Sequence, residues 1–152
     1  MAEYVATIEW SRGDQSFLDQ KYSRVHDWRF DGGAVVKGSP APTSVPAPMS
    51  DPSAVDPEEA LVAAVSSCHM LFFLAFAAKA GFVVDRYRDD AVGTMSRDDR
   101  GKTAITEVVL RPDIAFSGAG PDAAALTDLH HRAHEACYIA NSIRGEVRVE
   151  SR

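Results

Sequence analysis

Hydrophobic and polar side chains alternate at the start of the chain. From Tyr4 to Trp10 apolar residues fall on every second position, which is the period of a β-strand, and residues 11–14 then have turn composition. Spaced aromatic residues and a turn at residues 31–33 indicate further short strands between residues 17 and 38. The pattern therefore predicts a small group of strands before the chain changes character.

Residues 39–57 contain six of the eight prolines. Because proline lacks the amide hydrogen that strands and helices need, this composition predicts an extended loop. A loop of this length is either a surface connection or a cover over a partner surface, and the sequence leaves both open.

A strong helix start follows the loop. Asp56 suits the N-cap, Pro57 suits the first helical position, and Glu59 lies three residues after the cap. Because Gly81 is a stop signal, the sequence predicts a helix of about 36 Å over residues 57–80.

Residues 60–78 carry no formal charge, a length sufficient for a membrane-spanning helix. The polar residues 66–69 near the centre, and the missing aromatic and basic flanks, argue against a membrane span. A helix that is apolar on every side is otherwise buried in protein. In a chain of this size, the pattern favours a homodimer in which the second copy covers one face.

The remaining sequence predicts strands and one more helix. Residues 83–95 and 103–116 are strand-like and are joined by a charged turn, which predicts a hairpin. Helical spacing of apolar residues runs from Pro121 to at least Cys137, and a short last strand follows Gly145.

Composition and charge narrow the class of protein. The 152 residues are 45% hydrophobic and 25% charged, which is typical of one globular domain, so residues 1–152 are interpreted as a single domain. A net charge of −6 without any basic run argues against nucleic acid as a partner. The N-terminus lacks the pattern of a secretory signal, and two cysteines do not make a disulfide framework. We therefore expect a cytoplasmic protein with reducible thiols and no membrane partner.

The two cysteines are the main candidates for chemistry. Cys68 falls near the middle of the long predicted helix, and Cys137 falls near the end of the second. Each alone is compatible with a small buried hydrophobic residue. As a pair, one thiolate can attack a peroxide and the other thiol can resolve the sulfenic acid as a disulfide. Because a mid-helix position gains little from the helix dipole, Cys68 would need an arginine, for which Arg24 and Arg29 are candidates.

Two segments resemble a known family. Residues 56–68, with the sequence DPEEALVAAVSSC, are similar to the signature of the OsmC/Ohr superfamily, the osmotically inducible and organic hydroperoxide resistance proteins. In that family a Pro-Glu-Glu or Pro-Glu-Gln stretch opens the central helix, and the peroxidatic cysteine follows ten residues after its first glutamate. Residues 133–137 resemble the segment of the second cysteine.

The resemblance implies an α+β fold: N-terminal strands, a long central apolar helix, a β-hairpin, a second helix and a short last strand, assembled as an intertwined homodimer. It also implies a peroxiredoxin-like reductase of organic hydroperoxides, which uses a dithiol reductant of the lipoyl or thioredoxin-like type and no cofactor or metal. By position, Cys68 is the peroxidatic residue and Cys137 the resolving residue. Glu58 is the carboxylate that orients an arginine, for which Arg24 is preferred over Arg29.

Two residues depart from the family pattern. Tyr138 stands where a proline commonly follows the second cysteine, and His69 stands where an apolar or aromatic residue is frequent. These differences favour an OsmC-like branch whose peroxide or electrophile is not the standard one. In addition, Glu58 and Cys68 are separated by about 15 Å along a straight helix. Glu58 would therefore serve the thiolate of the other subunit, unless the helix is kinked.

Two interpretations without peroxidase chemistry stay open. His130, His134 and Cys137 share one helical face and have the donor types of a zinc site, with His69 and His131 as further ligands. The other interpretation is a non-catalytic dimeric binding module with an apolar pocket between helices and both cysteines in the core.

Leu71 and Phe72 lie about one helical turn beyond Cys68. They belong either to the core or to an apolar funnel that would favour bulky organic peroxides.

Overall fold

The computed structural model of this chain describes residues 1–150. Contacts divide the chain into two compact units, Met1–Ala60 and Leu61–Arg152. The single-domain interpretation of the sequence stays a prediction.

The N-terminal unit contains a three-stranded antiparallel sheet. Its strands are β1 Ala6–Glu9, β2 His26–Phe30 and β3 Val35–Gly38, in the order β1-β2-β3. The turn between β2 and β3 is closed by the amide of Gly33, which donates to the carbonyl of Phe30 at 2.9 Å and has a φ of 88°. The predicted short strands and the turn at residues 31–33 are confirmed.

The proline-rich segment after β3 is irregular, as predicted. Between β3 and the first helix it makes one isolated bridge, Gly38 to Val55. Its interior is held by the buried hydroxyl of Ser39, which accepts a hydrogen bond from the amide of Asp51 at 2.8 Å. The loop therefore returns to the sheet without forming a strand of its own.

The long helix α1 spans Pro57–Lys79. The amide of Glu59 donates to the Asp56 carboxylate at 2.7 Å, and the amide of Asp56 donates to the Glu59 carboxylate at 3.3 Å. This reciprocal capping box stabilises the start of the helix. After the helix, Gly81 adopts a φ of 86°, a conformation that glycine takes without a steric penalty. The predicted helix and both of its end signals are confirmed.

The strands after α1 form two pairs rather than one long hairpin. Their bounds are β4 Val83–Asp89, β5 Val92–Arg97, β6 Thr103–Leu110 and β7 Pro112–Ser117. The pairing partner of β5 is β6, whereas β4 pairs with β7. The Asp89 carboxylate accepts a hydrogen bond from the Arg111 amide at 2.6 Å, where the second predicted strand is interrupted. The predicted hairpin is thus confirmed for β5 and β6, and its uninterrupted extent is wrong.

The second helix, α2, spans Ala123–Ala136 and starts two residues after Pro121. The prediction of its start is wrong because Asp122, not Pro121, governs it: the Asp122 carboxylate caps the helix by accepting from the Ala125 amide at 2.8 Å. Cys137 is the C-cap, and a short 3-10 turn, η1 Ala140–Ser142, follows. The predicted last strand is β8 Glu146–Val149, which pairs in parallel with β6.

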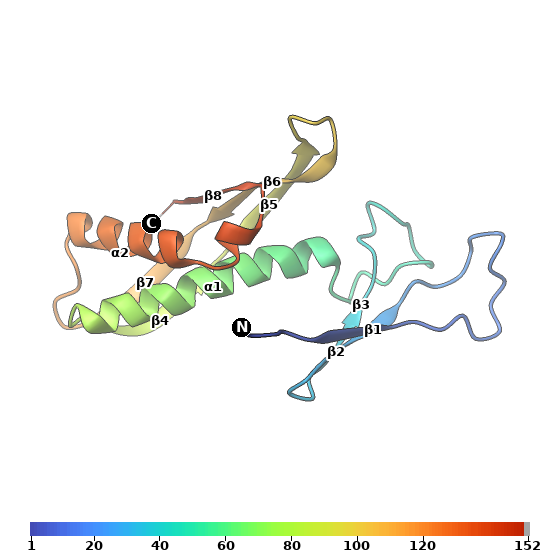
Figure 1. The fold of residues 1–152 in the computed structure, drawn as a ribbon, viewed down its shortest axis with the longest axis horizontal. Helices are drawn as coiled ribbons and strands as arrows, with labels where there is room; N and C mark the ends of the chain where they lie inside the picture. The colour runs from blue at the N-terminus through green and yellow to red at the C-terminus, as the bar shows by residue number, and fades with distance from the viewer. Residues whose placement is uncertain (151–152) are drawn as a thin grey trace. The chain divides into compact units, whose positions relative to one another are not determined.

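The two helices lie side by side and run in opposite directions, with the strands of the second unit against them (Figure 1). One buried cluster joins α1, α2, β4 and β7 around Phe73, Ala77, Leu129 and Ala133. A second cluster joins α1 to the sheet β5-β6-β8 around Val65, with Val108 and Leu110. Both clusters bury the same stripe of α1, so this helix is the central element of the unit.

A close approach of two backbones at Gly145 gives a stability prediction. A Cβ at this position would lie 2.6 Å from the carbonyl oxygen of Ile105 in β6, and a strand backbone cannot rotate aside. We expect Gly145→Ala to destabilise the protein by about 2–3 kcal/mol. The measurement is the free energy of unfolding from urea denaturation. Gly32→Ala is the matched control, since nothing lies within 4 Å of a Cβ there; equal effects of the two substitutions would contradict the prediction.

Candidate functional site

The two cysteines, which are 69 positions apart in the sequence, meet in space. Cys68 comes from the middle of α1 and is half-buried, whereas Cys137 comes from the end of α2 and is completely buried. Burial raises the pKa of the Cys137 thiol, and the neighbouring Cys68 side chain raises it further. The amide of Ala140, 3.4 Å from the Cys137 sulfur, acts in the opposite direction. Both thiols are free, so the site holds a reduced dithiol with one accessible member.

Two histidines form a buried pair between the helices. The Nε2 atom of His69 on α1 and the Nδ1 atom of His130 on α2 lie 3.0 Å apart, and the rings are stacked with an interplanar angle of 12°. The outer nitrogens, Nδ1 of His69 and Nε2 of His130, have no partner within the described chain. One neutral ring therefore donates to the other in the protein interior.

Burial controls the charge of this pair. It lowers the pKa of His69 to about 4, and the nearby His130 and His134 also oppose protonation of that ring. Burial likewise lowers the pKa of His130 to about 4, although the Asp89 carboxylate favours its charged form. Both rings are consequently neutral at pH 7.

The Asp89 carboxylate at the end of β4 binds both α1 and the junction between β6 and β7. Asp89 accepts hydrogen bonds from the Ser66 hydroxyl of α1 at 2.5 Å and from the Arg111 amide at 2.6 Å. Burial, together with the Asp89 charge, raises the pKa of Tyr87, whose buried hydroxyl has no partner among residues 1–150. The buried side of α1 therefore has near it the Asp89 carboxylate, the Tyr87 phenol and the two neutral imidazoles of His69 and His130.

The described residues do not bring together the ligand set that the sequence suggested for zinc. Within residues 1–150, no three histidine, cysteine or acidic side chains are grouped as metal ligands. His130 uses one nitrogen on His69, while Cys137 has Cys68 as its neighbour. Of the three residues on this helical face, His130 and Cys137 are buried and His134 is half-buried.

The other predicted site residues lie in the N-terminal unit. Arg24 donates to the carbonyls of Tyr22 and Gln20 at 3.0 and 3.1 Å, and its guanidinium covers the Tyr22 ring. Arg29, in contrast, pairs with the carboxylates of Glu9 and Asp27, both at 3.0 Å. Of the two arginines, Arg24 is the one without a carboxylate partner in the described chain.

Arg24 also lines an apolar recess of about 330 Å³, together with Ile8, Trp10, His26, Pro40 and Pro57.

Glu58 is half-buried in the first turn of α1 and forms no salt bridge within residues 1–150. Because α1 is continuous from Pro57 to Lys79, no break in the helix supports the kink alternative. The roles of Arg24 and Glu58 remain predictions.

Apolar side chains lie near the dithiol on both helices. Leu71 is 61% exposed, and Phe72 packs edge to face against the ring of Tyr138, which is 69% exposed. Leu71 and Tyr138 are thus uncovered in the single chain, in contrast to the buried Val65. Tyr138 directly follows Cys137 in the chain and contributes an exposed aromatic ring there.

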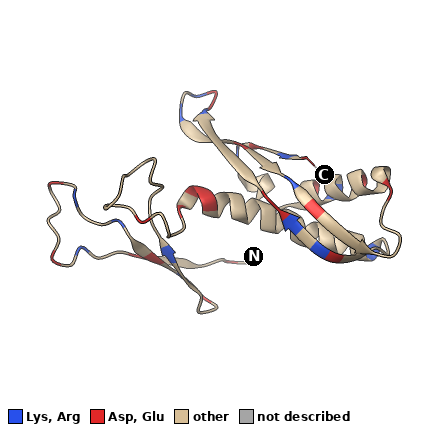
Figure 2. Cartoon of the chain, turned by 180° about the vertical axis from the view of Figure 1, so that it is seen from behind, with Lys and Arg blue, Asp and Glu red and all other residues tan. Residues whose placement is uncertain are grey.

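Most of α1 is uncharged, and one side of it is exposed in the single chain. Figure 2 shows acidic residues in its first turn followed by a long length without charge. The helix is long and apolar enough to cross a membrane by length and composition, and 22% of its most apolar window is buried. The core helix of a soluble protein can pass the same test, and the buried stripe of α1 packs against α2 and the sheets.

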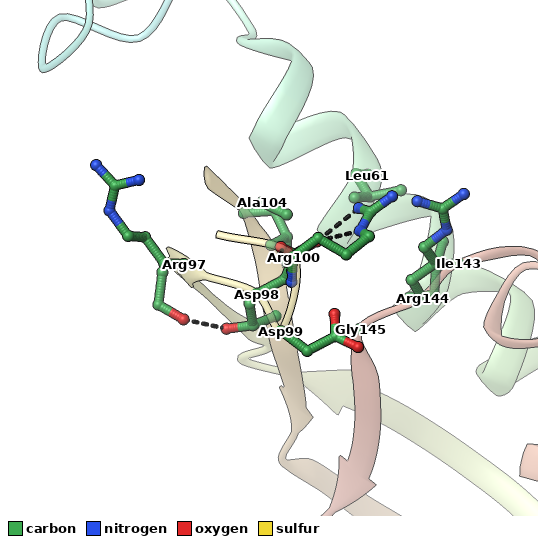
Figure 3. Close-up of a pocket in the computed structure, with 12 residues that line it drawn as sticks. Leu61, Arg97, Asp98, Asp99, Arg100, Ala104, Ile143, Arg144 and Gly145 are labelled. Carbon is green, nitrogen blue, oxygen red and sulfur yellow. Dashed lines mark hydrogen bonds and ion pairs between the residues drawn. The ribbon is translucent and has the colours of Figure 1, made fainter. Parts of the chain in front are cut away.

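A larger recess of about 610 Å³ lies away from the cysteines (Figure 3). It is lined mainly by the end of the β5–β6 hairpin and by residues 143–145. The guanidinium of Arg100 there is already paired with Asp98 at 2.5 Å. Since no cysteine or histidine lines this recess, it offers neither a thiol nor an imidazole, and the dithiol remains the candidate site.

Comparison with known protein families decides the classification of this arrangement. The model of the family described as OsmC-like protein matches residues 50–152, which include both helices and both cysteines. This chain belongs to the OsmC-like family. The resemblance found in the two cysteine segments is thereby confirmed. A comparison with curated protein sequences gave no match.

Solved structures agree with the OsmC-like classification. An OsmC-like protein of unknown function from Vibrio cholerae is 49% identical, with complete coverage of both chains and a TM-score of 0.98. An organic hydroperoxide resistance protein OsmC from Legionella pneumophila is 16% identical, covers 99% of this chain and 96% of its own, and has a TM-score of 0.69. OhrB of Bacillus subtilis, another organic hydroperoxide resistance protein, is 17% identical over 99% and 98% of the two chains, with a TM-score of 0.67. The α+β OsmC-like fold is therefore established.

The sequence did not predict the histidine pair or the Asp89 contacts. His69 and His130 were visible as polar residues within helical faces that are otherwise apolar, but their spacing suggested ligands and not partners. Asp89 gave no signal beyond its place at the end of a strand-like segment. These contacts join segments that are distant in the chain, so local spacing does not specify them.

Proposed function

We propose that this protein reduces organic hydroperoxides with two cysteines, Cys68 attacking the peroxide and Cys137 resolving the product. The observation that carries the proposal is the neighbouring pair of free thiols, one half-buried and one completely buried. A peroxide can approach the half-buried Cys68 sulfur. The buried Cys137 sulfur is protected from peroxide until the Cys68 sulfenic acid forms beside it. Family membership and the named resistance proteins of similar fold add independent support.

The two steps balance without a cofactor. In the first, the Cys68 thiolate attacks one peroxide oxygen, the O–O bond breaks, and the alkoxide leaves as an alcohol after taking up the thiol proton. In the second, the Cys137 sulfur displaces water from the Cys68 sulfenic acid and forms a disulfide. The peroxide is reduced and the two thiols are oxidised. A cytoplasmic dithiol of the lipoyl or thioredoxin-like class would restore them, with its own oxidation to a disulfide.

The test is a stoichiometric oxidation. The reduced protein is titrated anaerobically with cumene hydroperoxide, and the thiols and their bridges are mapped by mass spectrometry. We expect loss of both thiols, formation of one Cys68–Cys137 disulfide per chain, and a trapped Cys68 sulfenic acid in Cys137→Ser. Persistence of both free thiols after one equivalent of peroxide would contradict the proposal and favour the non-catalytic binding module.

We further propose that the working form is a homodimer. The exposed side of α1 carries mainly small and apolar residues at helical spacing: Ala64, Ser67, Leu71, Ala75 and Ala78. Such a surface allows a second helix to approach closely, and burying it removes apolar area from water. A second copy would also bring a Glu58 to the site, which one straight helix keeps about 15 Å from Cys68. In this arrangement Glu58 orients Arg24 beside the thiolate.

A charge on this side of α1 is expected to dissociate the dimer. Ala75→Glu places a carboxylate on the exposed stripe, where an apolar interface would have to desolvate it. In sedimentation equilibrium we expect the wild type at twice the chain mass of 16.5 kDa and the variant near the chain mass. Ala124→Glu on the exposed side of α2 should leave the mass unchanged. A wild type that sediments at the mass of one chain would contradict the proposal.

A further inference from the structure

The hydrogen bond between His69 and His130 joins two buried side chains, one on α1 and one on α2. The two side chains are among the few buried polar groups of the protein, with 1% and 5% exposure. A buried hydrogen bond of this kind adds little net stability, but its loss leaves unpaired nitrogens in the core. Its effect is therefore greater on the position of the helices than on the total free energy of folding.

The surrounding contacts between the helices are apolar, and they fix the position of one helix along the other less strictly than a hydrogen bond does. Phe73 and Ala77 of α1 pack with Leu129 and Ala133 of α2. Hydrophobic contact is non-directional, so similar apolar area can be buried after a shift along the helix. A shift of α1 by one turn would place Val65 or Phe73 opposite His130, and both imidazoles would lose their partner.

Each histidine of the pair lies on the same helix as one of the two thiols, and close to it along the chain. His69 follows Cys68 directly on α1, and His130 precedes Cys137 by seven residues, which is the same face of α2 two turns earlier. Any change in the register of the helices therefore moves one sulfur relative to the other. A disulfide requires Cβ atoms about 3.5–4.5 Å apart, so it tolerates little displacement.

We propose that the His69–His130 hydrogen bond is a positioning contact that holds α1 and α2 in the register in which the Cys68 and Cys137 thiols meet. This inference rests on the proposed function insofar as the two thiols are partners in a disulfide. The histidines touch neither the peroxide nor the reacting sulfurs in this role. The attack of Cys68 on a peroxide is independent of the pair, whereas closure of the disulfide depends on it.

The experiment compares three variants with the wild type. His69→Leu/His130→Leu removes the bond and replaces both rings by apolar groups, which avoids an orphaned nitrogen. His69→Gln/His130→Asn retains amide groups near the positions of Nε2 and Nδ1, and so offers a substitute hydrogen bond. His131→Asn is the matched control, since His131 is an exposed histidine on the same helix.

Two measurements separate positioning from peroxide chemistry. The first is the equilibrium of the Cys68–Cys137 disulfide with a glutathione buffer, which involves no peroxide. The second compares the rate of Cys68 sulfenic acid formation, measured in a Cys137→Ser background, with the rate of disulfide closure in the same variant carrying both cysteines. For the double leucine variant we expect the disulfide equilibrium constant and the closure rate to fall by about tenfold to a hundredfold. Sulfenic acid formation should stay within about twofold of the wild type, since it needs no contact with Cys137.

The glutamine–asparagine variant should recover most of the loss, and His131→Asn should lose nothing. A folded double leucine variant with wild-type disulfide equilibrium and closure rate would overturn the inference. If that variant does not fold, His130→Met is measured in its place, because methionine fills an irregular space without offering a strong acceptor. If glutathione closes the disulfide as expected while cumene hydroperoxide leaves Cys68 unoxidised, the proposed function fails and the positioning role stands.

Discussion

Cys68→Ser is expected to consume no organic hydroperoxide above the uncatalysed background, a loss of at least about a thousandfold in turnover. The reason is chemical: a serine hydroxyl is far less ionised and less nucleophilic than a thiolate, and the buried Cys137 cannot replace it. The measurement is the decrease of cumene hydroperoxide in the presence of an excess of dithiol. Cys137→Ser should instead complete one stoichiometric oxidation of Cys68 and then depend on direct reduction of the sulfenic acid.

The exposed Ser67 provides a control in the same turn of α1. Ser67→Ala keeps the proposed dimer surface small and uncharged, so it should leave turnover within about twofold of the wild type. Wild-type consumption of hydroperoxide by Cys68→Ser would remove the basis of the proposed function. The non-catalytic binding module would then be the better account of the same fold.

Acidification is expected to destabilise the protein through the buried histidine pair. Each ring has a pKa of about 4 in the folded chain and 6.5 as its ordinary value, so the unfolded chain binds protons more readily. The contribution of the neutral pair to the free energy of unfolding is fully present above about pH 6.5. It decreases as the pH falls from there towards pH 4. Between pH 7 and pH 5 the expected loss is about 2 kcal/mol of unfolding free energy for each ring.

Urea denaturation at several pH values measures this slope. The titratable groups that act on the pair are His134 of α2 and the Asp89 carboxylate of β4. Asp89 weakens the effect on His130, whereas His134 strengthens the effect on His69. His69→Gln/His130→Asn should flatten the curve between pH 7 and pH 5, and His131→Asn should retain it. Parallel curves for the wild type and the double variant would show that these rings do not cause the loss.

Much of the fold was predictable because its signals are local. The Asp56 and Glu59 side chains bind each other's amides within one turn, so the start of α1 can be inferred from four residues. The division of the strands could not be inferred in the same way. The Asp89 carboxylate binds an amide 22 residues away at Arg111, and this contact depends on the tertiary structure.

The candidate site was predictable in part, for a similar reason. The spacing from Glu58 to Cys68 and the segment around Cys137 carried the family signature, and family membership followed from them. The pairing of His69 with His130 was not predictable, because the two residues are 61 positions apart and spacing along one helix does not specify a contact with another. The proposed roles of Arg24 and Glu58 come from their positions in the sequence.

The unequal depth of the two sulfur atoms has a consequence for recycling. In an oxidised protein, an incoming reductant can reach only the Cys68 side of the bridge, since Cys137 is completely enclosed. The mixed disulfide would thus form on α1, with Cys137 as the leaving group. Burial raises the pKa of that thiol, and a thiol of high pKa departs slowly. Reopening of the bridge would thus be slowed, and the oxidised form would accumulate whenever peroxide arrives faster than reducing equivalents.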